Sequence, residues 1–177
     1  MNYRNAGAAA LVFCSLGMTG CGAGDQAVPL PEVTPITSTS PAVSENRVDP
    51  EIFRGPGDDY LFKHLGTNGQ VRECFFDTAA ATCLGVAGPD IPDISVPPFA
   101  DQAPSAVSVT EAGVRYTIFE GVPPAYETLE PGQSLELGPV RCELNDASDL
   151  TCSVGDNSFA IDGDSGLIST EGVVIQD

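Results

Sequence analysis

Four cysteines, Cys74, Cys83, Cys142 and Cys152, constrain the fold of this chain more than any other feature of its sequence. They form two closely spaced pairs, C-x8-C and C-x9-C, and such pairs in an exported chain favour disulfides. Four cysteines can be connected in three ways, and the register of the flanking residues favours the two local pairs. A zinc site is the alternative, although neither spacing contains the C-x2-C knuckle that is typical of structural zinc.

The register argument is most complete around Cys142 and Cys152. If these two cysteines face each other on antiparallel strands, the flanking apolar residues also face each other: Val140 lies opposite Val154, and Leu144 lies opposite Leu150. Polar residues occupy the alternate positions, so one face of the hairpin is apolar and the other polar, as a half-buried antiparallel pair requires. The loop 145–149, Asn-Asp-Ala-Ser-Asp, has the composition of a turn.

Cys74 and Cys83 predict a similar hairpin around residues 77–80, Asp-Thr-Ala-Ala. Their pairing sets Phe76 opposite Ala81 and Val71 opposite Val86. Each of the two bridges would close a loop of about ten residues, for which the chain-entropy model gives a stabilisation of about 2 to 3 kcal/mol.

The remainder of the chain after residue 50 alternates apolar and polar residues in short stretches cut by Gly, Asn, Asp and Pro, which is typical of strands and turns. The segment Asp58–Leu65 is the sole helical candidate, with Leu61 and Leu65 on one face. Further strands are expected at Val107, Val114, Leu135, Phe159 and Ile168. The sequence therefore predicts an all-β fold, either a small disulfide-bonded antiparallel β-sandwich or a partly open barrel, with about six to eight strands.

The N-terminus predicts export and lipidation. Arg4 precedes a short apolar run, residues 8–16, which is too short to span a bilayer. The run leads into Leu16-Gly17-Met18-Thr19-Gly20-Cys21, which resembles the lipobox of bacterial lipoproteins, with Met18 where that pattern prefers leucine. The resemblance implies transfer of diacylglycerol to the Cys21 thiol, cleavage before Cys21, and acylation, as by palmitate, of the new N-terminus. The alternative is an ordinary secretory signal in which Cys21 is incidental.

These features predict three parts in the 177 residues. Residues 1–20 are a lipoprotein signal peptide, and residues 21–50 are the lipidated cysteine with a disordered Pro/Thr/Ser-rich tether. Residues 51–177 are one β-rich extracytoplasmic domain. The protein is therefore expected at the cell membrane, anchored by lipid on the extracytoplasmic face.

The charge balance limits the choice of partner. The chain carries 25 acidic and 7 basic side chains, a formal net charge of -18. Such a surface repels the phosphate backbone, so nucleic acid is not an expected partner. Anionic lipid headgroups repel the folded part for the same reason, so contact with the bilayer depends on the acylated Cys21.

The second half of the chain resembles a family of small exported actinobacterial proteins that contain a domain of unknown function. The residues that carry the resemblance are Leu129-Glu130-Pro131-Gly132, Leu135, Cys142, Asp149-Leu150-Thr151-Cys152 and Phe159-Ala160-Ile161. Phe62, Gly69, Cys74 and Cys83 could match the earlier half of the family pattern. The resemblance supports export and the fold, and it implies no reaction.

Three groups of residues are candidates for a catalytic or metal-binding site. The run Gly163-Asp164-Ser165-Gly166 with His64 invites comparison with serine proteases, but a turn explains the run, and about 127 residues cannot build two barrels. Asp156, Asp162 and Asp164 resemble the start of a calcium loop, but the rest of that pattern is absent. His64 is expected at the surface or in a hydrogen bond, and the aromatic residues, Tyr126 included, in the core. We therefore predict no catalytic residue, no metal site and no cofactor.

Together these features predict a lipid-anchored envelope lipoprotein that is not an enzyme and acts as an accessory or protein-interaction module. Its expected partners are the lipid bilayer, through Cys21, and an envelope or membrane protein. The alternative function is that of a lipoprotein that binds a small ligand or a glycan, and a hydrolase is the third candidate.

Overall fold

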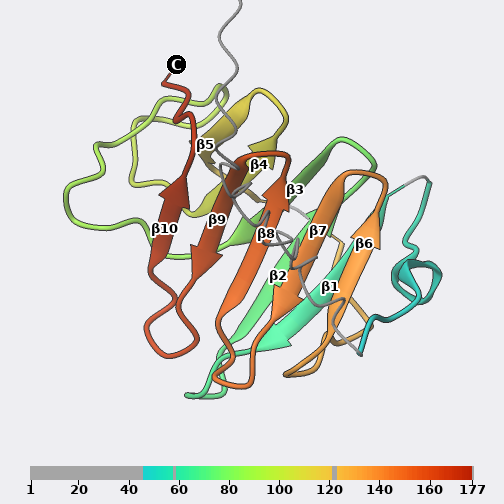
Figure 1. The fold of residues 1–177 in the computed structure, drawn as a ribbon. Coiled ribbons are helices and arrows are strands. Elements are labelled where there is room, and N and C mark those ends of the chain that lie inside the picture. Colours follow the sequence, from blue (N-terminus) through green and yellow to red (C-terminus); the bar gives the residue numbers. More distant parts are fainter. Residues whose placement is uncertain (1–45, 58, 121–122, 177) are drawn as a thin grey trace, which may run out of the picture. The chain divides into compact units, whose positions relative to one another are not determined.

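The alternating sequence forms ten strands in two antiparallel five-stranded sheets (Figure 1). In the computed structural model, residues 46–57, 59–120 and 123–176 are described. The predicted signal peptide, Cys21 and residues 21–45 of the predicted tether lie outside this range. The prediction of an all-β antiparallel sandwich with two disulfides is confirmed, and the described strands exceed the expected six to eight.

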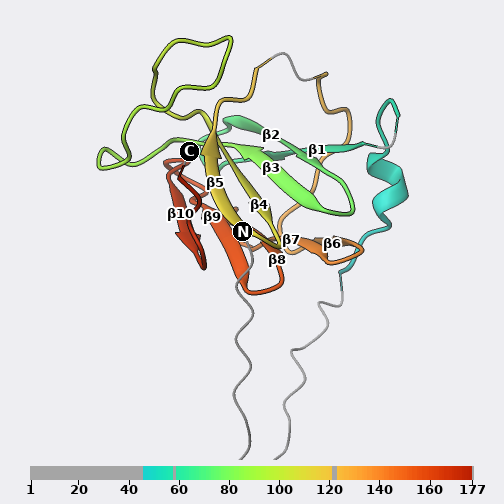
Figure 2. The same cartoon turned by 90° about the horizontal axis from the view of Figure 1, so that it is seen from above.

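Both sheets are meanders in which each strand pairs with the next strand along the chain. The first sheet contains β1 (Tyr60–Leu65), β2 (Val71–Phe76), β3 (Ala80–Leu84), β4 (Ala106–Thr110) and β5 (Gly113–Thr117). The second contains β6 (Ser134–Leu137), β7 (Val140–Leu144), β8 (Leu150–Val154), β9 (Asn157–Ile161) and β10 (Ile168–Glu171). Strands β3 to β5 pack against β7 to β9. Figure 2 shows the two sheets as layers.

The hairpin of β7 and β8 has the predicted register at every position. Cys142 pairs with Cys152, Val140 with Val154 and Leu144 with Leu150. All six side chains are buried, and the Cys142–Cys152 disulfide lies within the core. The alternation of the sequence is sufficient to set this register, because a slip of one residue would turn the whole apolar face outward.

The hairpin of β2 and β3 follows the prediction only near its turn. Cys74 pairs with Cys83 and Phe76 with Ala81, and the Cys74–Cys83 disulfide is formed. The expected pairing of Val71 with Val86 is wrong. Strand β3 ends at Leu84, and Val86 instead makes two backbone hydrogen bonds to the segment that leads into β10. The Val86 N–H donates to the Gly166 carbonyl, and the Ile168 N–H donates to the Val86 carbonyl.

The expected helix at Asp58–Leu65 is also wrong, because residues Tyr60–Leu65 form strand β1. Leu61 and Leu65 are four residues apart, and residues at this spacing share a face in a strand as well as in a helix. The strand is favoured because Tyr60, Phe62 and His64 alternate into the core. Leu61 and Lys63 lie between them and pair with Phe75 and Glu73 of β2.

The folded unit begins before the predicted boundary at residue 51. Val48 donates its N–H to the Ser134 carbonyl at 2.8 Å, and a short 3-10 helix, η1 (Pro50–Phe53), follows. Asp49 caps η1 by accepting from the Glu51 N–H at 3.0 Å. Phe53 is 2% exposed and contacts the Phe62 ring edge-on, with ring centroids 6.0 Å apart. Residues 46–50, predicted as tether, therefore pack against the sandwich.

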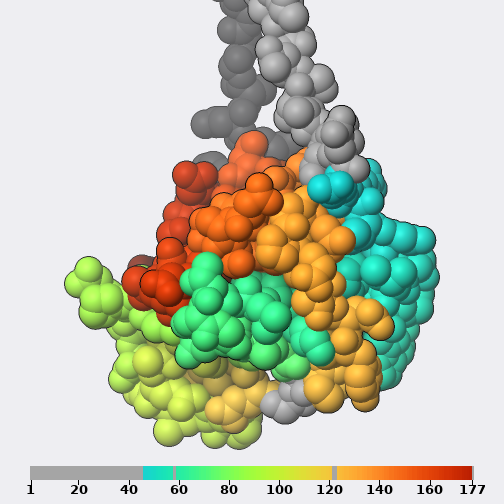
Figure 3. Space-filling view, turned by 90° about the horizontal axis from the view of Figure 1, so that it is seen from below, coloured from blue at the N-terminus to red at the C-terminus, as the bar shows by residue number. Residues whose placement is uncertain are grey.

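Each edge strand of the two sheets is paired in part by a short segment from elsewhere in the described chain. In the first sheet, parallel bridges join Lys63 of β1 to Thr128 and Val114 of β5 to Val174. In the second sheet, they join Ser134 of β6 to Arg47 and Leu167, the residue before β10, to Val86. Exposed strand edges promote aggregation, so these caps make the open sandwich compatible with a soluble body. The long connection between β3 and β4 stands out from the two layers (Figures 2 and 3).

Candidate functional site

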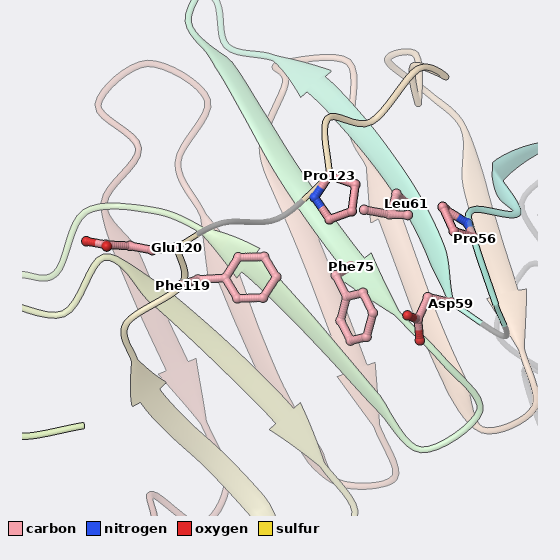
Figure 4. Close-up of a pocket in the computed structure, with 7 residues that line it drawn as sticks. All are labelled: Pro56, Asp59, Leu61, Phe75, Phe119, Glu120 and Pro123. Atoms are coloured by element: carbon pink, nitrogen blue, oxygen red, sulfur yellow. The ribbon is translucent and has the colours of Figure 1, made fainter. Parts of the chain in front are cut away.

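A groove with an apolar floor lies on the outer face of the first sheet. Leu61 of β1 and Phe75 of β2 are register partners, and their side chains form the floor. Phe119, two residues after β5 ends, lies against Phe75 with ring centroids 6.1 Å apart. Figure 4 shows Phe119 beside Phe75, with Leu61 and Pro123 next to each other above Phe75 in this view. Outer faces of sandwich sheets are ordinarily polar, so this patch is unusual.

Two segments wall the groove. One is residues 52–56, which comprise the end of η1 and the residues after it; the other is the connection from β5 to β6, whose described residues lie over the outer face of the sheet. Two hydrogen bonds fasten this connection to the sheet: the Ala125 N–H donates to the side-chain Oε1 of Glu73 at 3.0 Å, and the Lys63 N–H donates to the Glu127 carbonyl at 3.0 Å. This wall is therefore fastened to both β1 and β2.

The groove consists of two adjoining hollows of about 270 and about 380 Å³. Pro56, Leu61 and Pro123 line both of them. We define the outer-face groove by the residues that give it its apolar character: Pro56, Leu61, Phe75, Phe119, Pro123 and Tyr126. Both hollows are open to solvent, and together they offer an elongated surface in place of an enclosed cavity.

Tyr126 is 82% exposed at the rim of the outer-face groove, and Ile52 beside it is 55% exposed. The expectation that Tyr126 belongs to the core is therefore wrong. Aromatic side chains that stand in solvent beside an apolar floor are typical of contact surfaces, because tyrosine offers a large apolar area at a low cost in conformational entropy.

The charge along the groove is negative. Asp59 and Glu120 line the first hollow and Glu127 the second, and no ion pair neutralises these three carboxylates among the residues that the structure describes. Arg54 lines the second hollow, but its guanidinium donates to both carboxylate oxygens of Glu51, at 2.9 and 3.1 Å. Hydrogen bonds from Arg54 and from the Tyr60 hydroxyl lower the pKa of Glu51, so the Arg54 charge is compensated locally.

Ser165 and His64, the candidate residues for hydrolase chemistry, do not form a hydrogen-bonded pair. The Ser165 hydroxyl donates to Asp162 Oδ1 at 2.6 Å. His64 lies fully buried in β1, and neither of its ring nitrogens has a hydrogen-bond partner in the described chain. The expectation of a surface or hydrogen-bonded histidine is therefore wrong. Burial, with the neighbouring Arg72 charge, lowers the pKa of His64 from 6.5 to about 4.

The acidic turn after β9 has a structural role. Asp162 Oδ1 accepts hydrogen bonds from the backbone N–H groups of Asp164 and Ser165 as well as from the Ser165 hydroxyl. These bonds lower the pKa of the Asp162 carboxyl. Within residues 46–57, 59–120 and 123–176, no group of three or more His, Cys, Asp or Glu side chains could hold a metal. The four domain cysteines are consumed in disulfides, so they are not available as zinc ligands.

Sequence reasoning missed the outer-face groove. Leu61 was assigned to a helix, and Phe75, Phe119 and Tyr126 were assigned to the core. The one local signal is the run Pro123-Pro124-Ala125-Tyr126, because a proline pair beside an aromatic residue in a connection between strands does not continue the strand pattern. The rest of the groove comes from three parts of the chain that only the fold brings together.

Comparison with known proteins adds no assignment: no protein-family model, no curated protein and no solved structure matches this chain. The resemblance to exported actinobacterial proteins therefore stays a prediction that rests on the quoted residues alone. Helices long and apolar enough to cross a membrane do not occur in the described ranges.

Proposed function

We propose that this protein is a lipid-anchored lipoprotein of the cell envelope whose β-sandwich is a contact module for another envelope protein, with the outer-face groove as the contact surface. The groove is the observation that carries the proposal: Phe75 and Phe119 in its apolar floor are only half-buried, and Tyr126 at its rim is 82% exposed. Fold stability alone gives no reason to leave this apolar surface uncovered, and exposed apolar patches typically mark contact surfaces.

The anchor is the second part of the proposal. The lipobox-like run before Cys21 supports it, and two buried disulfides suit an oxidising compartment outside the cytoplasm. Acyl chains on Cys21 would hold the domain at the bilayer, since each buried methylene contributes about 0.8 kcal/mol. We expect Cys21→Ser to release the protein from the detergent phase to the aqueous phase; detergent partitioning and processing like those of the wild type would contradict the anchor.

The contact surface is tested by crosslinking in intact cells followed by purification in mild detergent. Phe119→Ser and Tyr126→Ser are expected to lose a crosslinked envelope protein that the wild type retains. Val71→Ser is the matched control, because Val71 is also an exposed apolar residue of the first sheet, 57% exposed, and does not line the groove. Retention of the same crosslinked protein by both groove variants would overturn the proposal.

A second candidate function, binding of a small apolar ligand, is favoured by a separate hollow of about 470 Å³. It lies between the β3–β4 connection and the C-terminal segment, and its apolar lining includes Ile91, Ile94, Tyr116, Val174 and Ile175. A panel of metabolites and glycans in a thermal-shift assay tests this function. A ligand of this hollow should raise the melting temperature of the wild type and leave that of Ile94→Ser unchanged.

A further inference from the structure

We propose that the outer-face groove binds an extended, cationic peptide segment of the partner protein, with two of its apolar side chains in the two hollows and its lysine or arginine side chains against Asp59, Glu120 and Glu127. This inference rests on the contact function proposed above.

The shape of the groove favours an extended segment. Pro56, Leu61 and Pro123 lie where the two hollows meet, so the surface offers two adjoining sites of limited size along one line. An extended chain presents successive side chains to alternate sides and can fill such sites one after the other. Aromatic and proline side chains, here Phe75, Phe119 and Tyr126 with Pro123, are the surfaces on which extended proline-containing peptides dock in other proteins.

The charges favour a cationic segment. In Figure 4, Glu120 lies on the far side of Phe119 and Asp59 on the opposite side, next to Phe75, and Glu127 lines the second hollow. Arg54, the cation that lines the second hollow, already holds Glu51 in a two-point hydrogen bond. A basic side chain at either end of a bound segment would therefore meet a carboxylate that has no ion-pair partner in the described chain. The net charge of -18 adds long-range attraction for a basic partner.

The same charges argue against the two nearest alternative occupants. A second copy of this chain would bring another charge of -18 to the acidic rim, and like charges across an interface oppose association. Residues 22–45 of this chain contain prolines and leucine, but they carry three acidic residues and no lysine or arginine. Both alternatives therefore place negative charge against the carboxylates of the groove.

Binding is measured by fluorescence anisotropy with the full mature chain and three labelled peptides of equal length. The first is Arg-Pro-Leu-Pro-Pro-Leu-Pro-Arg, the second replaces both arginines by glutamate, and the third replaces both leucines by serine. We expect the first to bind at least ten times more tightly than either of the others. Its affinity should fall as salt rises, because the contribution of exposed charges is screened.

Matched variants locate the binding. Tyr126→Ala is expected to weaken the first peptide about tenfold, and the double variant Asp59→Asn with Glu120→Gln to remove most of the salt dependence. The control Asp156→Asn with Glu171→Gln changes the net charge equally, at an exposed turn residue between β8 and β9 and an exposed residue of β10, and should bind as the wild type does. Circular dichroism on every variant separates loss of binding from loss of fold.

The outcomes separate this inference from the proposed function. If groove variants lose the crosslinked envelope protein but the glutamate peptide binds as well as the arginine peptide, the contact function stands and the cationic occupant is wrong. Tight binding of a peptide with the sequence of residues 28–36 would identify the chain's own N-terminal segment as the occupant. A dimer in sedimentation velocity that Tyr126→Ala dissociates would identify a second copy. Either result overturns the inference.

Discussion

His64 should make the domain sensitive to mild acid. Its imidazole is fully buried in β1 with both nitrogens unpartnered in the described chain, and it pairs in register with Arg72 of β2. Arg72 is itself 6% exposed and, among the described residues, donates to the Gly163 carbonyl at 3.4 Å and to Gln70 Oε1 at 3.3 Å. A proton on His64 would therefore place a second positive charge beside a buried guanidinium that makes no ion pair within the described residues.

The sign of the effect follows from the lowered pKa. Unfolded chains take up a proton on this histidine near pH 6.5, whereas the folded protein does so only near pH 4, because burial and the Arg72 charge disfavour the imidazolium. The stability contributed by neutral His64 is therefore complete above pH 6.5 and is lost as the pH falls toward 4. With these two pKa values, the linkage relation gives a loss of about 2 kcal/mol between pH 7 and pH 5.

Urea unfolding at pH 7, 6 and 5 with the disulfides intact measures this loss directly. We expect the free energy of unfolding of the wild type to fall by about 2 kcal/mol more than that of His64→Phe between pH 7 and pH 5. Phenylalanine suits the site because Phe62 and Phe76 already pack in the same core. The carboxylates with lowered pKa, Glu51 and Asp162, are present in both proteins and cancel in the comparison.

Equal pH dependence of wild type and His64→Phe would refute the reasoning, since it would mean that the buried imidazole titrates at the same pH in the folded and unfolded states. The chemical shift of the single histidine of the chain provides an independent reading. Proton NMR of the folded wild type should give a midpoint near 4, as the lowered pKa of His64 requires.

Two other substitutions test how the sandwich is held together. Replacing Cys142 and Cys152 together by alanine should lower the free energy of unfolding by about 2 to 3 kcal/mol in urea titrations; no change in the unfolding midpoint would contradict a stabilising role for the bridge. Gly166→Ala should cost at least about 1 kcal/mol in the same assay, because residue 166 has a φ of +75°. The added Cβ would also lie 2.8 Å from Nε of Arg72, so a wild-type unfolding midpoint would argue against this close packing.

Local pairing was predictable because the interacting residues are close in the sequence. In the β7–β8 hairpin, the cysteines, the flanking valines and leucines and the polar turn all require the same register. In the β2–β3 hairpin, the same argument held near the turn and failed at Val86, where the chain leaves the ladder to meet Gly166 and Ile168. The register prediction failed at the position where a segment distant in the sequence, residues 166–168, takes the backbone hydrogen bonds of Val86.

The helix expected at Asp58–Leu65 failed for a different reason. A four-residue spacing of leucines does not distinguish a helix from a strand over so short a segment. The inward side chains of β1 gain their environment from Phe53 and Phe76, which belong to separate elements. The contacts that favour the strand therefore cannot be inferred from the sequence of this segment alone.

By itself, the sequence determined the all-β class, the two disulfide pairings and the acidic surface, because alternation, cysteine spacing and charge are properties of neighbouring residues or of composition. Only the tertiary structure decided that β1 carries its histidine inward, that short distant segments cap the sheet edges, and that Leu61, Phe75, Phe119 and Tyr126 form an open groove. These features join residues tens of positions apart, and burial depends on which distant segment covers a face. The alternation along a single strand does not contain that information.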